Sequence, residues 1–254
     1  MVDRTLTGIE GLDKALNGGV PQGNIVLISG GAGTGKSTLC LQFIINGAMK
    51  FNEKSLYITT EQNYEELSRQ AKCYDWNIKQ LESKGLLRVF YLDVVSEKNF
   101  LDTLDQELQR FQPQRIVVDS MTTLTDNLTI TDFKDKTAFS MVEIMDNVVP
   151  TPLSEKLIIK NVLYSLINKL KRDTDATAFL TTELYEDAKG LSADGVSEFI
   201  CDGVIKLDYI GVGSVEYRSM VIRKMRYTSH EKKPLSYDMG SSGIEFSKEE
   251  KLNF

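Results

Sequence analysis

The residues with the clearest chemical potential lie between Gly30 and Ser37, where the chain runs GGAGTGKS. This run fits the pattern G-x-x-x-x-G-K-[ST], whose glycines let the backbone wrap closely around phosphate and turn its N–H groups inward. Lys36 would then reach the β- and γ-phosphates of a nucleoside triphosphate, and the Ser37 hydroxyl would ligate Mg²⁺. The residues expected to contact the nucleotide here are Gly31, Ala32, Gly33, Thr34, Gly35, Lys36, Ser37 and Thr38.

The elements that flank this loop decide whether the match is meaningful, because a random chain of this length matches about once in a hundred. Residues 24–29, NIVLIS, form a short apolar run rich in β-branched side chains, which predicts a buried strand. Residues 37–50 carry apolar side chains at helical spacing. Strand, glycine-rich loop and helix N-terminus therefore follow one another, which is the context that phosphate binding requires.

Two carboxylates complete the chemistry expected at such a loop. Asp119 ends the apolar run RIVVDS (115–120), where a neighbouring strand would bring it to the Mg²⁺ shell; the alternative is an Asp that only caps a strand end or turn. Glu61 closes SLYITTE (55–61) and would orient or deprotonate the attacking water at the carboxyl edge of the sheet. The alternative for Glu61 is a cap on the helix that follows.

The rest of the chain alternates strand and helix patterns, which predicts an α/β fold with a mostly parallel sheet and right-handed crossovers. The further predicted elements are strands at 86–93 and 177–183 and helices at 63–76, 99–111 and from Thr151-Pro152 to Leu170. A polar stretch, 122–151, holds one helical piece around 137–148, and 184–197 is expected to be a mobile loop. Three alternating runs after residue 203 predict antiparallel or edge strands.

Composition limits the class of protein. The chain has 254 residues, which suits one domain over 1–254, and it has no apolar run long enough to span a membrane. The N-terminus lacks signal-peptide features, and three scattered cysteines predict reduced thiols in a cytoplasmic protein. A formal net charge of −6 argues against a purely electrostatic coat on DNA, although a local basic groove remains compatible with it.

Two cations lie close together near the C-terminus, and their spacing alone leaves two interpretations open. Lys224 and Arg226 are two residues apart, so on a strand they project from the same face and can meet one γ-phosphate. The alternative is a pair of solvated charges on an edge strand, where lysine is common.

Several motifs together resemble the RecA superfamily, and most closely its KaiC-like branch, which includes archaeal RadA paralogs. The segments that carry the resemblance are TGIEGLD at 7–13, GGVPQG at 18–23, the glycine-rich loop, ITTEQ, RIVVDSMTTL, FLTTE and VSEFICDGVIKL with RKMRYTSHEKKP. The resemblance implies a RecA-like fold and six-membered homo-oligomeric rings that hold ATP and Mg²⁺ between subunits. It implies that Lys224 and Arg226 reach the ATP of the next protomer, that Met225, Thr228 and His230 contact the nucleotide, and that Cys73 lines the base pocket.

The chain departs from that family at two places. Glu61-Gln62 replaces the usual pair of glutamates, so hydrolysis is expected to be slow. The 122–151 segment is longer than the usual connection and is expected to be an inserted, mobile piece. It would face the ring channel with the loop at 184–197, where Lys134, Lys136 and Lys189 are the cations available to single-stranded DNA, diluted by nearby carboxylates.

Three functions therefore stay open at this point. The first is a homo-oligomeric ATPase that modulates DNA recombination or repair as a RadA paralog. The second is a KaiC-like signalling or scaffold ATPase, whose nucleotide state governs partner binding or Ser/Thr phosphorylation. The third is a nucleotide-binding structural protein with little turnover, which Gln62 favours.

Overall fold

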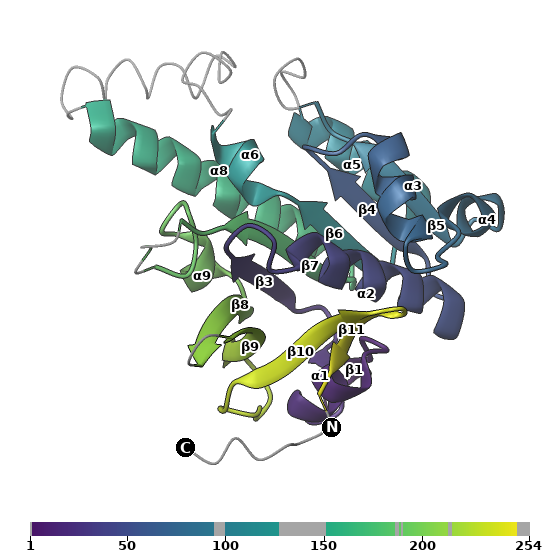
Figure 1. Cartoon of the computed structure of the whole chain (residues 1–254). Helices are drawn as coiled ribbons and strands as arrows, with labels where there is room; N and C mark the ends of the chain where they lie inside the picture. Colours follow the sequence, from purple (N-terminus) through teal and green to yellow (C-terminus); the bar gives the residue numbers. More distant parts are fainter. Residues whose placement is uncertain are drawn as a thin grey trace.

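A long mixed sheet dominates the computed structural model, which describes residues 2–93, 100–126, 151–185, 188, 190–212 and 215–247 (Figure 1). Its strands follow the spatial order β11-β10-β9-β8-β3-β7-β6-β4-β5. The parallel strands are β3 (Ile25–Gly30), β4 (Ser55–Thr59), β5 (Leu87–Tyr91), β6 (Arg115–Asp119), β7 (Thr177–Glu183) and β8 (Gly203–Val212). The antiparallel strands are β9 (Val215–Met225), β10 (Leu235–Gly240) and β11 (Gly243–Phe246), and β1 (Arg4–Thr5) pairs separately with β2 (Val20–Pro21).

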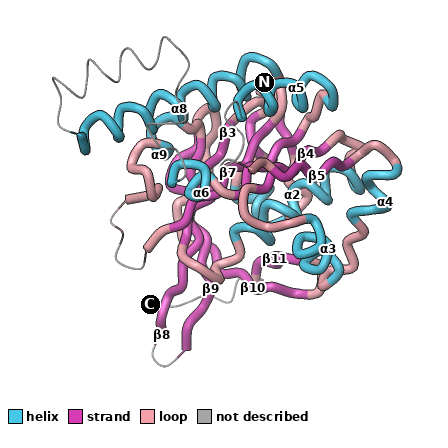
Figure 2. Tube along the Cα trace, turned by 90° about the horizontal axis from the view of Figure 1, so that it is seen from above, coloured by secondary structure: helices cyan, strands magenta, loops and turns pink. Residues whose placement is uncertain are grey.

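Helices cover both faces of the parallel strands, as Figure 2 shows from above. One layer packs with α1 (Glu10–Ala15), α2 (Lys36–Lys50), α3 (Tyr64–Lys72) and α4 (Ile78–Ser83). The other packs with α5 (Phe100–Phe111), α6 (Met121–Asp126), α8 (Thr151–Asp173) and α9 (Ser197–Ile200). Within β3, Val26 and Ile28 enter the first layer while Ile25 and Leu27 enter the second, because successive side chains of a strand alternate in direction. Both faces are therefore apolar, as expected for parallel strands covered by helices.

Helix α2 is the central packing element of the first layer. Its buried side chains lie all along the helix, and Phe43 stacks on Phe179 of β7 with ring centroids 4.1 Å apart. Burial on this scale stabilises by about 25 cal/mol per Å² of apolar surface. The position of the helix start, and of the loop before it, is thereby fixed against the sheet.

The predicted α/β architecture with antiparallel C-terminal strands is confirmed. The pattern did not indicate β10, and the first part of the polar stretch forms α6 instead of irregular chain. Helix α8 already includes Thr151, the residue at which its start was predicted. The helical piece predicted around 137–148 and the cations Lys134, Lys136 and Lys189 lie outside the described residues. None of the described helices is long and apolar enough to cross a bilayer.

Candidate nucleotide-binding site

The loop between β3 and α2 has the backbone shape that its glycines allow. Gly33 and Gly35 have φ angles of 74° and 97°, in the left-handed region that other residues rarely adopt. At Gly35 a Cβ atom would lie only 2.4 Å from Cε of Met239. The backbone conformation therefore requires glycine at this position, and a larger residue would also displace the end of the Met239 side chain.

Hydroxyl groups hold the loop from its own chain and from the C-terminal strands. Thr34 Oγ1 donates to the Gly31 carbonyl at 2.8 Å. The Tyr209 hydroxyl on β8 donates to the Gly33 carbonyl at 2.8 Å, and that of Tyr237 on β10 donates to the Thr34 carbonyl at 2.5 Å. Strands β8 and β10 thus fix two carbonyls of the loop.

The N–H groups of the loop remain available. Within the described part of the chain, the N–H groups of Gly33, Gly35 and Lys36 donate no hydrogen bond. Backbone donors of this kind are normally satisfied, and at a helix N-terminus they attract an anion. The cradle therefore fits a phosphate chain.

Lys36 lies inside this cradle with only 8% of its side chain exposed. Its Nζ donates to the Gly31 carbonyl at 3.0 Å and lies 3.6 Å from Oε1 of Glu183, whose side chain is 55% exposed. Glu183 ends β7 directly opposite Gly30. The sequence holds a signal for this acidic residue, since Glu183 closes the buried run TAFLTTE, although Glu183 is not among the predicted site residues.

Asp119 is buried two strands away from β3, with 7% exposure. Its carboxylate accepts hydrogen bonds from the Tyr57 hydroxyl at 2.6 Å and from Thr181 Oγ1 at 2.5 Å. No cationic side chain of the described residues forms an ion pair with it. Because a buried carboxylate needs a compensating charge, this arrangement fits a bound cation such as Mg²⁺.

The Asp119 carboxylate affects the pKa of two neighbouring side chains. Burial and then the Asp119 carboxylate raise the pKa of the Tyr57 hydroxyl well above its ordinary value. Burial and Asp119 also raise the pKa of the Cys40 thiol, whereas Lys36 lowers it. The anionic Asp119 and the cationic Lys36 therefore both act on the buried start of α2.

Glu61 lies beside the end of β6. Its Oε1 accepts a hydrogen bond from Ser120 Oγ at 2.5 Å and another from the Thr123 hydroxyl. The alternative role as a helix cap is wrong, because Asn63 caps α3 with bonds of 3.0 Å from the N–H groups of Glu65 and Glu66. The Glu61 carboxylate is therefore held next to Asp119 and free of a capping role.

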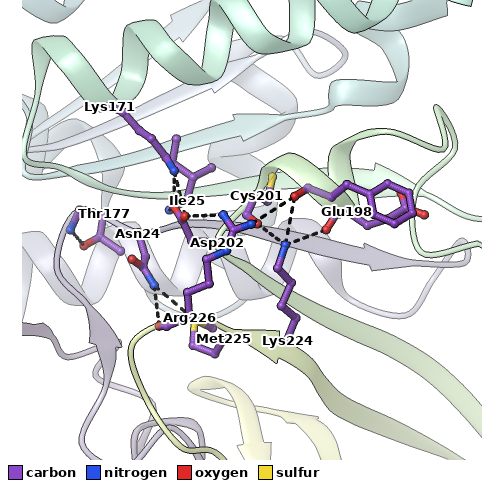
Figure 3. A network of polar contacts seen from close by, with 12 residues as sticks. Asn24, Ile25, Lys171, Thr177, Glu198, Cys201, Asp202, Lys224, Met225 and Arg226 are labelled. Carbon is purple, nitrogen blue, oxygen red and sulfur yellow. Dashed lines mark hydrogen bonds and ion pairs between the residues drawn. The ribbon is translucent and has the colours of Figure 1, made fainter.

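Lys224 and Arg226 lie at the edge of the sheet opposite the phosphate loop, near the amino end of β3. Figure 3 shows their polar contacts. Met225 pairs with Gly203, and Gly203 pairs with Val26, four residues before Gly30. Four residues of strand span about 13 Å, so these cations are not brought to the phosphate loop of their own protomer.

Both cations contact one short segment of their own chain. Lys224 Nζ donates to the carbonyls of Glu198, Phe199 and Cys201 at 3.0, 3.3 and 2.6 Å. The Arg226 guanidinium forms a 3.1 Å ion pair with Asp202 and a 3.5 Å bond to the Phe199 carbonyl. The two cations share the Phe199 carbonyl, but Arg226 lies one residue beyond the end of β9, so they do not project from one strand as the spacing predicted.

Comparison with known proteins decides the family. The family model described as the KaiC ATPase matches residues 5–147 and 129–251. This chain belongs to the KaiC ATPase family. A UPF0273 protein of Methanocaldococcus jannaschii is 30% identical over 95% of both chains. The structure of a KaiC-like protein of Pyrococcus horikoshii has a TM-score of 0.80 and 30% identity, covering 98% of this chain and 100% of that one.

The circadian clock oscillator protein KaiC of Synechococcus elongatus is 27% identical over 94% of this chain, which spans 43% of that protein. The chain is thus a RecA-superfamily P-loop ATPase of the KaiC-like branch, as the motifs predicted. The relatives' names do not mention DNA.

The other nucleotide contacts expected for a KaiC-like protein are dispersed in this protomer. The Met225 side chain points into the core, where its Sδ accepts a 3.7 Å bond from Asn24. The Met225 side chain is therefore buried, and its backbone pairs with Gly203 of β8. The Thr228 hydroxyl bonds to Arg4, and His230 Nδ1 lies 2.9 Å from the Glu231 carbonyl oxygen. Cys73 is exposed at the end of α3.

Proposed function

We propose that the chain binds ATP with Mg²⁺ at the Gly30–Ser37 loop and hydrolyses it as a cytoplasmic homo-oligomeric ring, with six copies and ATP at each subunit interface. The unpaired N–H groups around the buried Lys36 are the observation that carries this proposal. They form a site whose charge and donors suit a triphosphate, whereas adenine as the base is inferred from the family.

The Mg²⁺ ion would be held by the Ser37 hydroxyl and Asp119, where it would neutralise charge on the β- and γ-phosphates. Lys36 would exchange its contact with the Gly31 carbonyl for phosphate oxygens. Glu61 would orient the attacking water or accept its proton, since its carboxylate is exposed and lies beside the Asp119 strand. Gln62 supplies no second carboxylate, so slow turnover is expected.

The ring arrangement assigns Lys224 and Arg226 to the ATP of the neighbouring subunit. Their place at the far edge of the sheet supports this, because they lie about 13 Å along the strands from the loop of their own protomer. Such cations in trans stabilise the charge of the transferred phosphoryl group.

A mixing experiment tests this assignment. Glu61→Gln and Arg226→Ala are each expected to lower turnover by about 100-fold or more, since a base and a finger each contribute at least that much. Rings assembled from both variants should recover activity, because some interfaces then combine an intact Glu61 with an intact Arg226. Parental turnover in both single variants, or absence of recovery in rings of demonstrated mixed composition, contradicts the proposal.

The target of the ATPase separates two candidate functions. A role in DNA recombination, as a RadA paralog, stays a prediction; it requires that single-stranded DNA stimulates hydrolysis and that added salt reduces the effect. A signalling or scaffold ATPase is favoured by one observation, the two hydroxyl groups of Ser120 and Thr123 on the Glu61 carboxylate. Label on the protein after incubation with γ-labelled ATP would support phosphorylation in that second role.

A further inference from the structure

Asp202 connects three elements at the edge of the sheet that carries Lys224 and Arg226. Only 3% of its side chain is exposed. Its carboxylate receives Lys171 Nζ from α8 at 2.8 Å, the Ile25 N–H from β3 at 3.1 Å, and Arg226 at 3.1 Å (Figure 3). Asp202 is not among the site residues predicted from the sequence.

The backbone of Asp202 is fixed as firmly as its side chain. Its N–H donates to the Ile25 carbonyl at 2.8 Å, and its carbonyl accepts from the Arg226 N–H at 2.9 Å. The carboxylate therefore has little freedom to follow Arg226 if that side chain moves. The guanidinium must instead adapt to the carboxylate, which is how a buried anion sets the orientation of a more exposed cation.

The charges around Asp202 do not balance. Lys171 and Arg226 both pair with the single carboxylate of Asp202, and the ammonium of Lys224 bonds, among the described residues, only to carbonyls next to it. Glu198 directs its own carboxylate to Ser192 and the Leu191 N–H. Consistent with this excess, burial and then the neighbouring Arg226 lower the pKa of the Lys224 ammonium below its ordinary value. The cluster would therefore gain from an anion on its open side.

Arg226 can meet such an anion without leaving Asp202. Its side chain is 44% exposed, and the guanidinium has five N–H donors, of which the carboxylate and the Phe199 carbonyl use few. A guanidinium held on one edge by a carboxylate presents its other edge in a fixed direction.

We propose that Asp202 is a positioning residue for trans hydrolysis: it holds the guanidinium of Arg226 in the direction that meets the γ-phosphate of the neighbouring subunit. This role rests on the proposed function of Arg226. It adds a residue that touches no substrate and acts only through the geometry of the cation.

A purely structural role is the competing account, since Asp202 also joins α8 to the sheet through Lys171. Lys171→Met is the matched control, because it removes that tie and leaves the pair between Asp202 and Arg226. A structural role predicts the same change in stability and turnover for Lys171→Met and Asp202→Asn. A positioning role predicts that only Asp202→Asn lowers turnover.

The experiment compares kcat, KM for ATP and the melting temperature of the full chain. Asp202→Asn should lower kcat by about 10- to 100-fold, the scale of a misplaced reacting group, with KM within about twofold. Lys171→Met should lower the melting temperature and keep kcat within about twofold of the parent. The double variant Arg226→Ala/Asp202→Asn should be no slower than Arg226→Ala alone, since two residues acting as one unit are not additive.

Mixing adds a readout that a structural role would not move. Rings combining Asp202→Asn and Glu61→Gln subunits should regain turnover, because the second subunit supplies an intact Arg226 to the first. Should Asp202→Asn not fold, Asp202→Glu retains the charge at a displaced position and takes its place, with the same criteria.

Different outcomes contradict the role of Asp202 and the role of Arg226. Slow hydrolysis by Arg226→Ala together with parental kcat in Asp202→Asn overturns the role of Asp202 and leaves the proposed function intact. Equal losses of kcat in Asp202→Asn and Lys171→Met also overturn it. Parental hydrolysis by Arg226→Ala removes the trans function and the positioning role with it.

Discussion

The two edges of the parallel sheet hold their cations under opposite conditions. At the carboxyl edge Lys36 is nearly buried, yet it has one 3.0 Å hydrogen bond and a 3.6 Å contact with Glu183. At the other edge Lys224 donates to three carbonyls, and Arg226 is paired with the buried Asp202. Within the described residues, Lys36 thus has one direct hydrogen bond to the protein, whereas Lys224 and Arg226 are each oriented by several.

This difference follows from how each edge is assembled. The phosphate loop is one run of eight residues, Gly30 to Ser37, whose ligand is expected to complete it. The opposite edge brings together α8, the start of β8 and the end of β9. A site made of distant segments needs its own internal ties, because no single backbone turn positions its side chains.

The largest expected effect is a loss of ATP affinity at the carboxyl edge of the sheet. Lys36→Ala should weaken ATP binding by about 100-fold, because hydrogen bonds to charged groups contribute about 1.5–3 kcal/mol each. Titration with a fluorescent ATP analogue measures the change. Lys50→Ala, an equal loss of charge at the exposed end of α2, is the control and should leave affinity unchanged. Similar affinity losses in the two variants would contradict the assignment of Lys36.

A smaller effect is expected from removing the hydrogen bond by which Tyr237 of β10 holds the phosphate loop. Tyr237→Phe leaves the Thr34 carbonyl without its donor, which should cost about 1–3 kcal/mol of folding free energy and weaken ATP binding about fivefold. Urea unfolding and ATP titration measure the two quantities. Tyr217→Phe, at an exposed position of β9, should change neither. Unaltered ATP affinity in Tyr237→Phe would show that the loop keeps its shape without β10.

The substitution Glu183→Gln is expected to raise ATP affinity at the carboxyl edge, opposite in sign to the two variants above. Removing the carboxylate that faces Lys36 should tighten ATP binding about two- to fivefold at low salt, since exposed ion pairs contribute about 0.2–1 kcal/mol. The gain should shrink as salt is added. Glu216→Gln, an exposed acid on β9, controls for net charge. Weaker binding in Glu183→Gln would mean that this carboxylate assists the nucleotide.

The smallest effect concerns acid stability at the opposite edge. Burial alone would raise the pKa of the Asp202 carboxyl. The hydrogen bonds from Lys171 and the Ile25 N–H, the charge of Lys171 and the hydrogen bond from Arg226 outweigh this effect, so the pKa lies below the ordinary 3.8. The unfolded chain then binds the proton first as pH falls, so the stabilisation is present above pH 3.8 and is lost as pH falls through the folded pKa.

Urea unfolding of the parent and Asp202→Asn measures this contribution. The gap in unfolding free energy between them should be wide at about pH 6 and should narrow as the pH falls below 3.8, because the unfolded parent chain then binds a proton that the folded carboxylate resists. Asp238→Asn, at an exposed position of β10, should show no such narrowing. A gap that stays constant across this range would contradict the ion pairs of Asp202.

The sequence predicted the elements whose signals are local. The apolar β-branched run before Gly30 and the helical spacing after it identify β3 and α2 with near-correct bounds. Asp119 and Glu61 were found because each ends a buried run, where parallel strands deliver side chains to one edge. These inferences need only the chain direction and the alternation of strand and helix.

Contacts between segments far apart in the chain could not be predicted from the sequence. Tyr237 bonds to a carbonyl 203 positions earlier, and nothing in the run around it indicates that partner. Asp202 follows a predicted loop, and its three partners come from three elements. The inward direction of Met225 was equally hidden, because β8 and β9 have a register shift at Val204/Ile205. Such facts depend on strand order and register, which local patterns do not contain.

The neighbours of β3 have a consequence for the order in which the protein is made. This strand pairs only with β7 and β8, which begin at Thr177 and Gly203, although β3 itself starts at Ile25. A nascent chain therefore carries the strand before the phosphate loop, with unpaired edges, until most of the protein has left the ribosome. Long-range pairing of this kind slows folding and leaves hydrophobic surface and unpaired strand edges exposed until folding is complete. Ribosome-bound fragments that end before Gly203 should need protection by chaperones.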